Sequence, residues 1–431
     1  MHTLAFLDPG HFHAALTLGD RHPRVQDELV VHAPKGPELD DFVALIDGFN
    51  HRRERPTGWR VTVHAGERSL ERLVAERPGD VVVLAGRNDR KLATIRRLHD
   101  AGFHVLADKP WMTGPDGLDD LRHVLEAGPL AVEMMTGRHE ITARLAERLV
   151  GETPVFGNFA DAGADEPGIE ITSVHHLEKT VDGRPLRRPP WYFDVRVQGD
   201  GIADIPTHML DQAQRLVRAA PMDPADPGPG LELLAARTWS TAVPRALFER
   251  VTGLPEFPPE LAAVVAGSEL AYRGNAALAF RAGSVRVALD TRWDLSAPPG
   301  GGDTHRSVLR GTRSLVRVEQ GPATGFHRRL SVEPRGEPAR VEAALIRALA
   351  AWQSTHPGLS LAPAAAGWEI RVPPALDPGH ERHFPLVLAE FLALVDDGHR
   401  PARRAADTLA KYTLLAQAAV AARERDGAAR P

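Results

Sequence analysis

The apolar run VVVLA at residues 81–85 most constrains the fold of this 431-residue chain. A continuous apolar run without alternation predicts a strand buried on both faces, as in the centre of a parallel sheet. Strand-like segments at residues 3–7, 29–33 and 61–63 precede it, and another follows and ends at Asp108. Helical patterns separate these strands. The alternation therefore predicts a doubly wound α/β region with a parallel sheet.

The helical segments expected between these strands are less uniform than the strands. They are centred on residues 14–18, 42–46, 70–75 and 91–101. The connection at residues 36–58 is longer than usual, and we interpret it as an extra helix with a loop. Strand-like segments reappear after residue 155 and include residues 279–280, 285–289 and 314–319. This second region is expected to be α+β, with a largely antiparallel open sheet.

Composition narrows the class of partner. The net charge is −5 and charges of both signs are interspersed, which argues against a nucleic-acid-binding face or a basic membrane patch. The chain has no cysteine, which excludes disulfides, thiolate nucleophiles and cysteine metal sites. It shows no signal-like start and no run of eighteen apolar residues. We expect a cytoplasmic protein that binds a small molecule.

Two segments carry residues suited to chemistry. Asp108-Lys109-Pro110 directly follows a predicted strand, and the carboxyl ends of such strands are where α/β enzymes bind ligands. In the second segment a Gly-rich turn leads to Asp204 and His208, whose i, i+4 spacing places them on one helix face. A lysine, an aspartate and a histidine suit proton removal from a hydroxyl while a hydride leaves the same carbon.

Each of these residues also has a plainer interpretation. Lys109 is compatible with a solvated loop lysine, Asp204 with a helix N-cap, and His208 with a hydrogen-bonded core histidine. Their joint occurrence at the ends of two predicted elements favours the catalytic interpretation.

The first strand-to-helix turn has the sequence Asp8-Pro9-Gly10-His11-Phe12-His13. A dinucleotide-binding domain carries Gly-x-Gly-x-x-Gly here, and only the middle glycine is present. Gly10 allows the backbone to approach a pyrophosphate, whereas Asp8 places a negative charge near it. A plain turn without a ligand is an equal alternative. After the second strand Lys35 stands where an acidic residue would hold the ribose of NAD, so NAD and NADP both remain open.

These segments resemble the glucose-fructose oxidoreductase / inositol dehydrogenase (Gfo/Idh/MocA) family. The likeness rests on residues 108–110, on Asp204 with His208, and on residues 83–88, 101–106 and 409–414. Residues 7–16 and 173–176 are similar to an oxidoreductase subgroup with a distinctive C-terminal domain. The resemblance implies a Rossmann-type dinucleotide-binding domain over residues 1–150. It also implies a substrate-binding and oligomerisation domain with a C-terminal helix over residues 151–431.

By this resemblance the chain is an NAD(P)-dependent oxidoreductase that moves a hydride between nicotinamide and a hydroxyl carbon of a sugar, sugar derivative or cyclitol. Lys109 would hydrogen-bond the reacting hydroxyl, His208 would act as general base or acid, and Asp204 would orient both. Pro110 is often cis in such enzymes. The predicted cofactor-binding residues are Asp8, Gly10, His11, Phe12, Lys35, Gly86, Asn88, Asp108, Lys109 and Pro110.

The chain departs from the family pattern at three places. Asp108 replaces a glutamate, two glycines of the first turn are missing, and Lys91 stands where the family has a histidine after its Thr-Pro-Asn loop. These departures bear chiefly on how the cofactor would be held.

Imidazole donors and aromatic surfaces suit a polyol, so we expect substrate contacts from His175, His176, Trp191 and Tyr192. The same histidines with Asp204 and His208 would also suit a metal, but no recognised ligand spacing is present, and we predict none. Residues 221–230 and 298–303 are expected to be surface loops, the latter capping a substrate cleft between the domains.

Two alternatives to a simple dehydrogenase stay open. A redox-neutral enzyme could retain NAD and cleave a glycosidic bond, or eliminate a group, through a transient keto-sugar. A non-catalytic ligand-binding protein could keep the fold while its phosphate loop decayed, as Asp8 and His13 suggest. In either case the resemblance implies a homo-oligomer, a dimer or a tetramer. The sequence does not name the substrate or the direction of reaction.

Overall fold

The structure is a computed structural model that describes residues 1–160, 166–181, 184–221 and 230–428. It contains two compact units. The first comprises Met1–His139, Arg196–Gly199 and Gly379–Thr413, and the second comprises Glu140–Val195, Asp200–Pro378 and Leu414–Pro431. Each unit has its own sheet and is described by itself.

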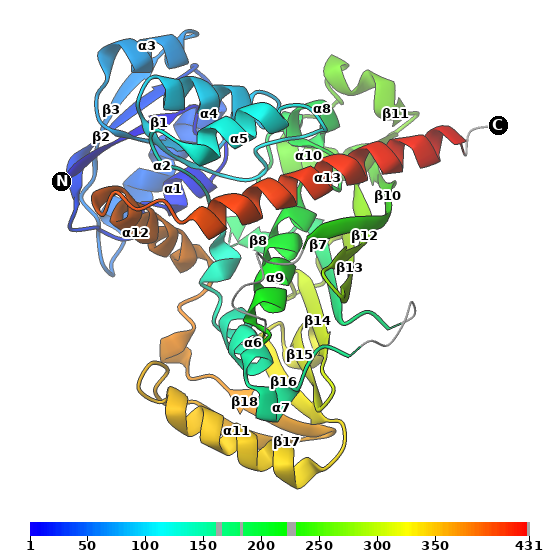
Figure 1. Ribbon diagram of the computed structural model, residues 1–431. Coiled ribbons are helices and arrows are strands. Elements are labelled where there is room, and N and C mark those ends of the chain that lie inside the picture. Colours follow the sequence, from blue (N-terminus) through cyan, green and yellow to red (C-terminus); the bar gives the residue numbers. More distant parts are fainter. Residues whose placement is uncertain (161–165, 182–183, 222–229, 429–431) are drawn as a thin grey trace. The chain divides into compact units, whose positions relative to one another are not determined.

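The first unit is built on a six-stranded parallel sheet in the order β3-β2-β1-β4-β5-β6 (Figure 1). The order runs outward in both directions from β1 and β4, which makes their carboxyl ends a topological switch point, the usual ligand position of such sheets. The predicted doubly wound parallel sheet is confirmed. The strands are β1 (His2–Leu7), β2 (Val25–Ala33), β3 (Arg60–Ala65), β4 (Val81–Leu84), β5 (His104–Ala107) and β6 (Ala131–Glu133).

The helices of this unit follow the predicted alternation with two differences. The first helix, α1, is a single turn, since it ends at Leu16 and does not reach Leu18. The predicted extra helix at residues 36–58 is wrong. That segment holds α2, which is the β2-to-β3 crossover itself and buries Leu39, Phe42 and Ile46 in the core. The helices are α1 (His13–Leu16), α2 (Pro37–His51), α3 (Ser69–Glu76), α4 (Lys91–Asp100) and α5 (Leu118–Glu126).

Residues far along the chain complete the core of the first unit. Helix α12 (His383–Asp396) contributes Phe384, Leu388 and Phe391 to the hydrophobic cluster that contains Leu4 of β1. A single division at residue 150 is therefore incorrect. The apolar face of α12 is buried on the first sheet, and α6 (Ile141–Gly151) belongs to the second unit.

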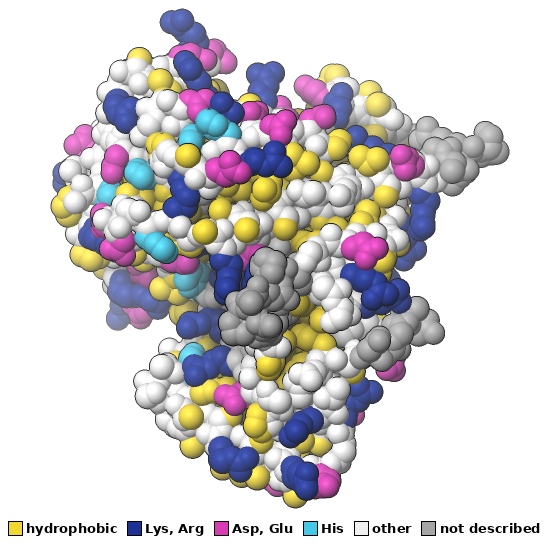
Figure 2. Space-filling view, in the orientation of Figure 1, with side chains coloured by type: hydrophobic (Ala, Val, Ile, Leu, Met, Phe, Trp, Pro, Cys, Tyr) yellow, Lys and Arg dark blue, Asp and Glu magenta, His cyan; other side chains and the backbone are white. Residues whose placement is uncertain are grey.

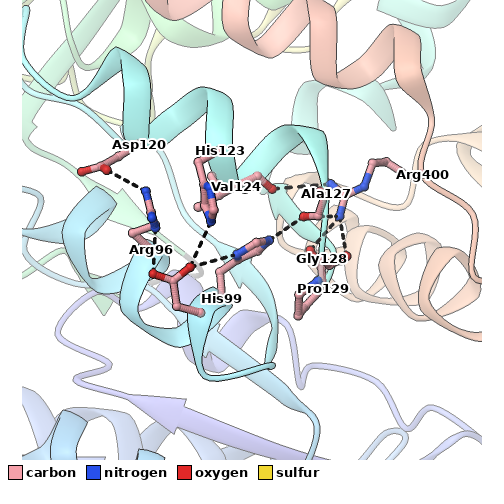
Figure 3. A network of polar contacts seen from close by, with 10 residues as sticks. Arg96, His99, Asp120, His123, Val124, Ala127, Gly128, Pro129 and Arg400 are labelled. Carbon is pink, nitrogen blue, oxygen red and sulfur yellow. Dashed lines mark hydrogen bonds and ion pairs between the residues drawn. The ribbon is translucent and has the colours of Figure 1, made fainter.

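Arg400 lies in the segment between the last two helices and holds this segment to the end of α5 by hydrogen bonds. Its guanidinium donates to five backbone carbonyls at the end of α5 and in the following loop. Figure 3 shows all of these contacts except the one to Leu125. Two of the acceptors, Gly128 and Pro129, lie at 2.8 Å. Since these carbonyls have no helical N–H partners, one arginine satisfies several groups at once. The acceptors are Val124, Leu125, Ala127, Gly128 and Pro129.

The second unit contains a ten-stranded, mostly antiparallel sheet in the order β10-β12-β13-β7-β14-β15-β16-β18-β17, with β11 paired to β12. Within this sheet, the β13–β7 pair is the only parallel one among the described strands. The predicted antiparallel sheet is confirmed. The strands are β7 (Ile169–Glu178), β10 (Leu231–Pro244), β11 (Val265–Ala266), β12 (Glu269–Ala282), β13 (Val285–Ser296), β14 (Thr304–Arg310), β15 (Ser314–Gln320), β16 (Arg329–Pro334), β17 (Ser360–Ala364) and β18 (Gly367–Arg371).

The remaining elements are short, apart from the helices α9 (Ile205–Ala219), α11 (Pro338–Trp352) and α13 (Ala402–Ala428). Beside α6, α9 and α11 the second unit has α7 (Thr153–Phe156) and α10 (Arg245–Thr252), and a small ribbon of β8 (Thr180–Val181) and β9 (Arg184–Pro185). Helix α8 (Val195–Gln198) lies mainly in the first unit, and α13 begins there. The 3₁₀ turns are η1 (Thr136–Arg138), η2 (Pro190–Phe193), η3 (Pro259–Val264), η4 (Pro322–Thr324), η5 (Pro374–Leu376) and η6 (His380–Arg382).

The charges of both signs noted in the sequence are also mixed on the face of the molecule seen in Figure 2, most plainly in the upper part of the view. Across the described ranges, none of the helices is both long and apolar enough to span a bilayer. Of the two predicted surface loops, residues 298–300 are exposed, whereas most of residues 221–230 lie outside the described residues.

Candidate functional site

The turn after β1 is held by backbone bonds at the switch point of the first sheet. Asp8 adopts a left-handed conformation with φ of 45°. Its N–H donates to the carbonyl of His32 at 2.9 Å, and the N–H of His11 donates to the carbonyl of Ala85 at 3.0 Å. The turn therefore lies between the carboxyl ends of β2 and β4.

Two glycines allow this turn to lie against the end of β4. A Cβ atom on Gly86 would come within 2.5 Å of the carbonyl oxygen of Asp8. A Cβ atom on Gly10 would lie 2.8 Å from a carboxylate oxygen of Glu38. Close packing within the chain itself therefore favours glycine at both positions.

The charges around this turn are mixed. Burial raises the pKa of Asp8, and the carboxylate of Glu38 acts in the same direction, while Arg87 opposes both. Lys35 is exposed in the loop after β2, and Phe12 immediately precedes α1 without a side-chain capping bond. A phosphate at this turn would thus meet one arginine and two carboxyls.

Asp108 connects the end of β5 to the same turn. Its Oδ2 atom lies 2.9 Å from Nδ1 of His13 and 3.5 Å from Nδ1 of His11, and Oδ1 accepts the N–H of Lys109 at 2.9 Å. Burial works to raise the pKa of Asp108, but His13, with His11 and Lys91, holds it far below its usual value. Asp108 is therefore an anion at neutral pH. The Lys109–Pro110 bond is cis, as expected.

The surroundings of His11 favour its neutral form. Burial lowers the pKa of His11 well below its ordinary value, and the neighbouring His13 adds to this effect. A neutral ring beside an ionised Asp108 places an imidazole nitrogen and a carboxylate together at the end of the sheet.

Asn88 has an internal role that the sequence did not reveal. Its Nδ2 donates to the backbone carbonyl of Gln198 at 2.8 Å, and its Oδ1 accepts from Lys91, which is 2 % exposed. The side chain predicted to contact a cofactor thus ties α4 to residues 196–199. The sequence signal for this contact was Lys91 itself, which stands where the family has a histidine.

A second unpredicted network supports the segment after Pro110. The N–H of Trp111 donates to Oη of Tyr412 at 2.7 Å, and the Tyr412 hydroxyl donates to Glu133. Lys411 also donates to Glu133, and all three side chains are buried. Burial raises the pKa of Tyr412 well above its ordinary value, with Glu133 adding to it. The family resemblance of residues 409–414 had singled out this part of α13 but had assigned it no role.

Asp204 and His208 belong to the second unit, and Lys109 belongs to the first. Asp204 occupies the N-cap position of α9 with Pro206 in the first turn, as the plainer interpretation expects, but its side chain makes no capping hydrogen bond. Its Oδ2 accepts the hydroxyl of Tyr192 at 3.4 Å. His208 is half-buried in the first turns of α9.

The aromatic residues near Asp204 are packed rather than exposed. Trp191 is 8 % exposed and Tyr192 4 %. The Arg188 guanidinium lies 4.6 Å from the Tyr192 ring centroid, and burial raises the pKa of the Tyr192 hydroxyl well above its ordinary value. Tyr192 therefore offers a hydroxyl donor to Asp204.

The paired histidines of β7 are held by Asp303, which the sequence did not single out. Nδ1 of His175 lies 3.0 Å from Oδ2 of Asp303, and the N–H of His176 donates to Oδ1 at 3.1 Å. Ser173 contacts Nε2 of His175 at 2.7 Å. Burial works to raise the pKa of Asp303, but the two histidines and Lys179 hold it far below its usual value.

The metal alternative for the histidines of β7 finds no geometric support. In the part of the chain that the structure describes, the groups whose ligand atoms converge do not combine these histidines with Asp204 or His208. The groups that do converge are His11, His13 and Asp108; His32, His64 and Glu76; and His99, Asp100 and His123.

Comparison with known proteins agrees with this architecture. Residues 145–423 match the family described as "Putative oxidoreductase C terminal domain". A solved structure of a putative oxidoreductase from Parabacteroides merdae is 33% identical, with coverage of 98% of each chain and a TM-score of 0.92. A search of curated proteins gave no match.

More distant solved structures share the fold. KijD10, a 3-ketoreductase from Actinomadura kijaniata in complex with NADP and TDP-benzene, is 14% identical over 97% of each chain, with a TM-score of 0.58. A putative myo-inositol dehydrogenase from Sinorhizobium meliloti is 12% identical over 99% of this chain and 98% of its own, with a TM-score of 0.54.

The parallel sheet and the antiparallel second unit give the chain the fold shared by these oxidoreductases. Within this class, the chain belongs to the family that carries the "Putative oxidoreductase C terminal domain". The resemblance identified from the sequence is confirmed.

Proposed function

We propose that this protein is an NAD(P)-dependent oxidoreductase that moves a hydride between nicotinamide and a hydroxyl-bearing carbon of a sugar, sugar derivative or cyclitol. The observation that carries the proposal is the edge of the first sheet, where Gly10, Gly86 and Asp108-Lys109 follow β1, β4 and β5. These strand ends flank the switch point at which doubly wound sheets bind dinucleotides.

The turn fits the cofactor in one specific respect. Gly10 and Gly86 leave the backbone without Cβ atoms where side chains would collide with their surroundings. Glycine at these positions keeps the turn packed against the end of β4, at the sheet edge where doubly wound sheets hold a pyrophosphate. NADP in KijD10 and NAD in GenD2, both solved as complexes, support NAD or NADP here. When bound, nicotinamide accepts or donates the hydride.

The chain's own residues would manage the proton. Lys109 would donate to the reacting hydroxyl and stabilise its developing negative charge. His208 would take up the hydroxyl proton, and Asp204 would orient the reacting groups while its carboxylate accepts the Tyr192 hydroxyl. His175 and His176, held by Asp303, would donate to other substrate hydroxyls.

The first experiment is to identify nucleotides released from the purified, undialysed protein by mass spectrometry, followed by titration with NAD and NADP. Binding of either supports the proposal, and copurification of NAD without net turnover would favour the redox-neutral reaction. No binding of either nucleotide would contradict the proposal and favour a non-catalytic ligand-binding protein. Lys35→Ala should weaken NADP more than NAD if this lysine contacts the 2′-phosphate.

The second experiment tests the proposed roles once a sugar or cyclitol substrate has been found by screening. Lys109→Met and His208→Ala should each lower kcat by about 10²-fold or more, with nucleotide affinity retained. The matched control for His208→Ala is His64→Ala on β3, at the far edge of the first sheet from β5. Near-normal turnover in Lys109→Met or His208→Ala would contradict that residue's role. Light scattering would check the expected dimer or tetramer.

A further inference from the structure

The turn after β1 and the end of β5 bring together three potential metal ligands. His11 and His13 are two residues apart, and Asp108 comes from the neighbouring part of the sheet edge. One nitrogen of each imidazole and one carboxylate oxygen all lie within 4.8 Å of one another. The imidazole rings meet edge to face with centroids 4.1 Å apart. The three side chains therefore present their polar atoms to one point.

The separations between these atoms match a coordination sphere. Oδ2 of Asp108 lies 2.9 Å from Nδ1 of His13 and 3.5 Å from Nδ1 of His11. Ligand atoms about 2.0–2.1 Å from a tetrahedral Zn²⁺ ion are about 3.3 Å apart. Small side-chain movements would bring all three atoms to that spacing.

An orphaned nitrogen gives independent support. Nδ1 of His11 is buried and has no hydrogen-bond partner within the described residues. A buried polar atom without a partner costs about 1–3 kcal/mol. Coordination of a metal ion by its lone pair would remove that cost.

The other two converging groups also contain buried nitrogens without hydrogen-bond partners, on His32 and His99. Their carboxylates, however, are 37% and 42% exposed, against 7% for Asp108, and each also pairs with an arginine through its second oxygen. Arg72 donates to Glu76 in the group with His32 and His64, and Arg96 donates to Asp100 in the group with His99 and His123. Asp108 instead accepts from His13 and from the backbone N–H of Lys109.

We propose that His11, His13 and Asp108 bind one divalent transition-metal ion of the Zn²⁺ type. Two imidazoles and a carboxylate favour Zn²⁺ or Fe²⁺ over Mg²⁺ or Ca²⁺, which prefer oxygen ligands. The ion replaces the hydrogen bond between His13 and Asp108. With three protein ligands, it keeps an open position for water or for an oxygen of a bound ligand.

The test is a titration of chelator-treated full-length protein with Co²⁺, whose visible absorption reports tetrahedral coordination, followed by displacement with Zn²⁺. It uses no nucleotide, so its outcome is separate from that of the cofactor experiment. We expect one ion per chain and no displacement by Mg²⁺. His11→Ala and His13→Ala should weaken Co²⁺ binding by at least about 100-fold, because even loss of a ligand's supporting partner costs 10–100-fold.

The controls are His64→Ala and His123→Ala, which remove one histidine from each of the other two groups. Both should bind Co²⁺ as the parent protein does. The proposal is overturned if the parent protein shows no saturable absorption, if either turn variant binds Co²⁺ normally, or if a control variant loses binding instead. Circular dichroism of each variant checks that it is folded, so that a loss of Co²⁺ absorption is due to the missing ligand. If a variant does not fold, the titration of the parent protein alone tests the proposal.

Discussion

Replacement of Lys411 by methionine should lower the free energy of unfolding of the first unit by about 3–5 kcal/mol. Its side chain is 1 % exposed and that of its partner Glu133 is 3 % exposed. Methionine preserves most of the volume, so the loss is chiefly electrostatic. It leaves the Glu133 carboxylate buried with the Tyr412 hydroxyl as its remaining partner in this network. Since a domain is typically stable by 5–15 kcal/mol, the effect is large.

The second half of this prediction is a double-mutant cycle. Glu133→Gln alone leaves the Lys411 ammonium without its anion and should also cost about 3 kcal/mol. The double variant Glu133→Gln/Lys411→Met removes both charges and should be more stable than the sum of the single losses by about 2 kcal/mol. The assay is urea denaturation followed by tryptophan fluorescence, since Trp59 and Trp111 are buried in the first unit and become exposed when it unfolds. Single losses below 1 kcal/mol with additive effects would refute the reasoning.

Three further perturbations have definite expected results. Gly86→Ala places a Cβ 2.5 Å from the carbonyl oxygen of Asp8. It should lower the free energy of unfolding by about 1–3 kcal/mol and weaken nucleotide binding by at least about 10-fold. The control is Gly48→Ala, whose Cβ meets nothing within 4 Å and which should be neutral or stabilising in the same assays. Burial and a nearby arginine lower the pKa of His305 from 6.5 to about 3. The unfolded chain therefore binds more protons between these values, and the neutral ring's contribution is complete above pH 6.5 and lost as the pH falls toward 3. His305→Gln should flatten the dependence of stability on pH in that window, and an unchanged slope would contradict this. Asn88→Ala removes an acceptor from buried Lys91 and should lower the unfolding free energy by about 1–3 kcal/mol, measured by urea denaturation.

Local patterns were sufficient for the first sheet. The apolar run at residues 81–85 predicted a strand buried on both faces, and all four residues of β4 are buried. Hydrophobic periodicity is a property of neighbouring residues, so it predicts a strand even when the segment that packs against the strand is unknown. The segment at residues 36–58 was misread because its length suggested an insertion, whereas the crossover helix itself fills most of it.

The candidate site was predictable residue by residue but not contact by contact. The sequence singled out Asp108 and His11 as cofactor-binding residues and noted His13 only as a departure from the glycine pattern, whereas the structure joins Asp108 to His13 across 95 positions. Asp303 was missed because it meets His175 across strand pairing, which no local motif encodes. The roles of Lys109, Asp204 and His208 remain proposals.

The sequence by itself determined the order of strands and helices, the parallel character of the first sheet and the family, because these depend on local periodicity and short motifs. Only the tertiary structure decided which distant segments share a core. Helix α12 packs with β1, and Lys411 pairs with Glu133 across 278 positions. The physical reason is that burial and charge pairing act between surfaces that meet only after the chain has folded, so the sequence position of one partner carries little information about the other.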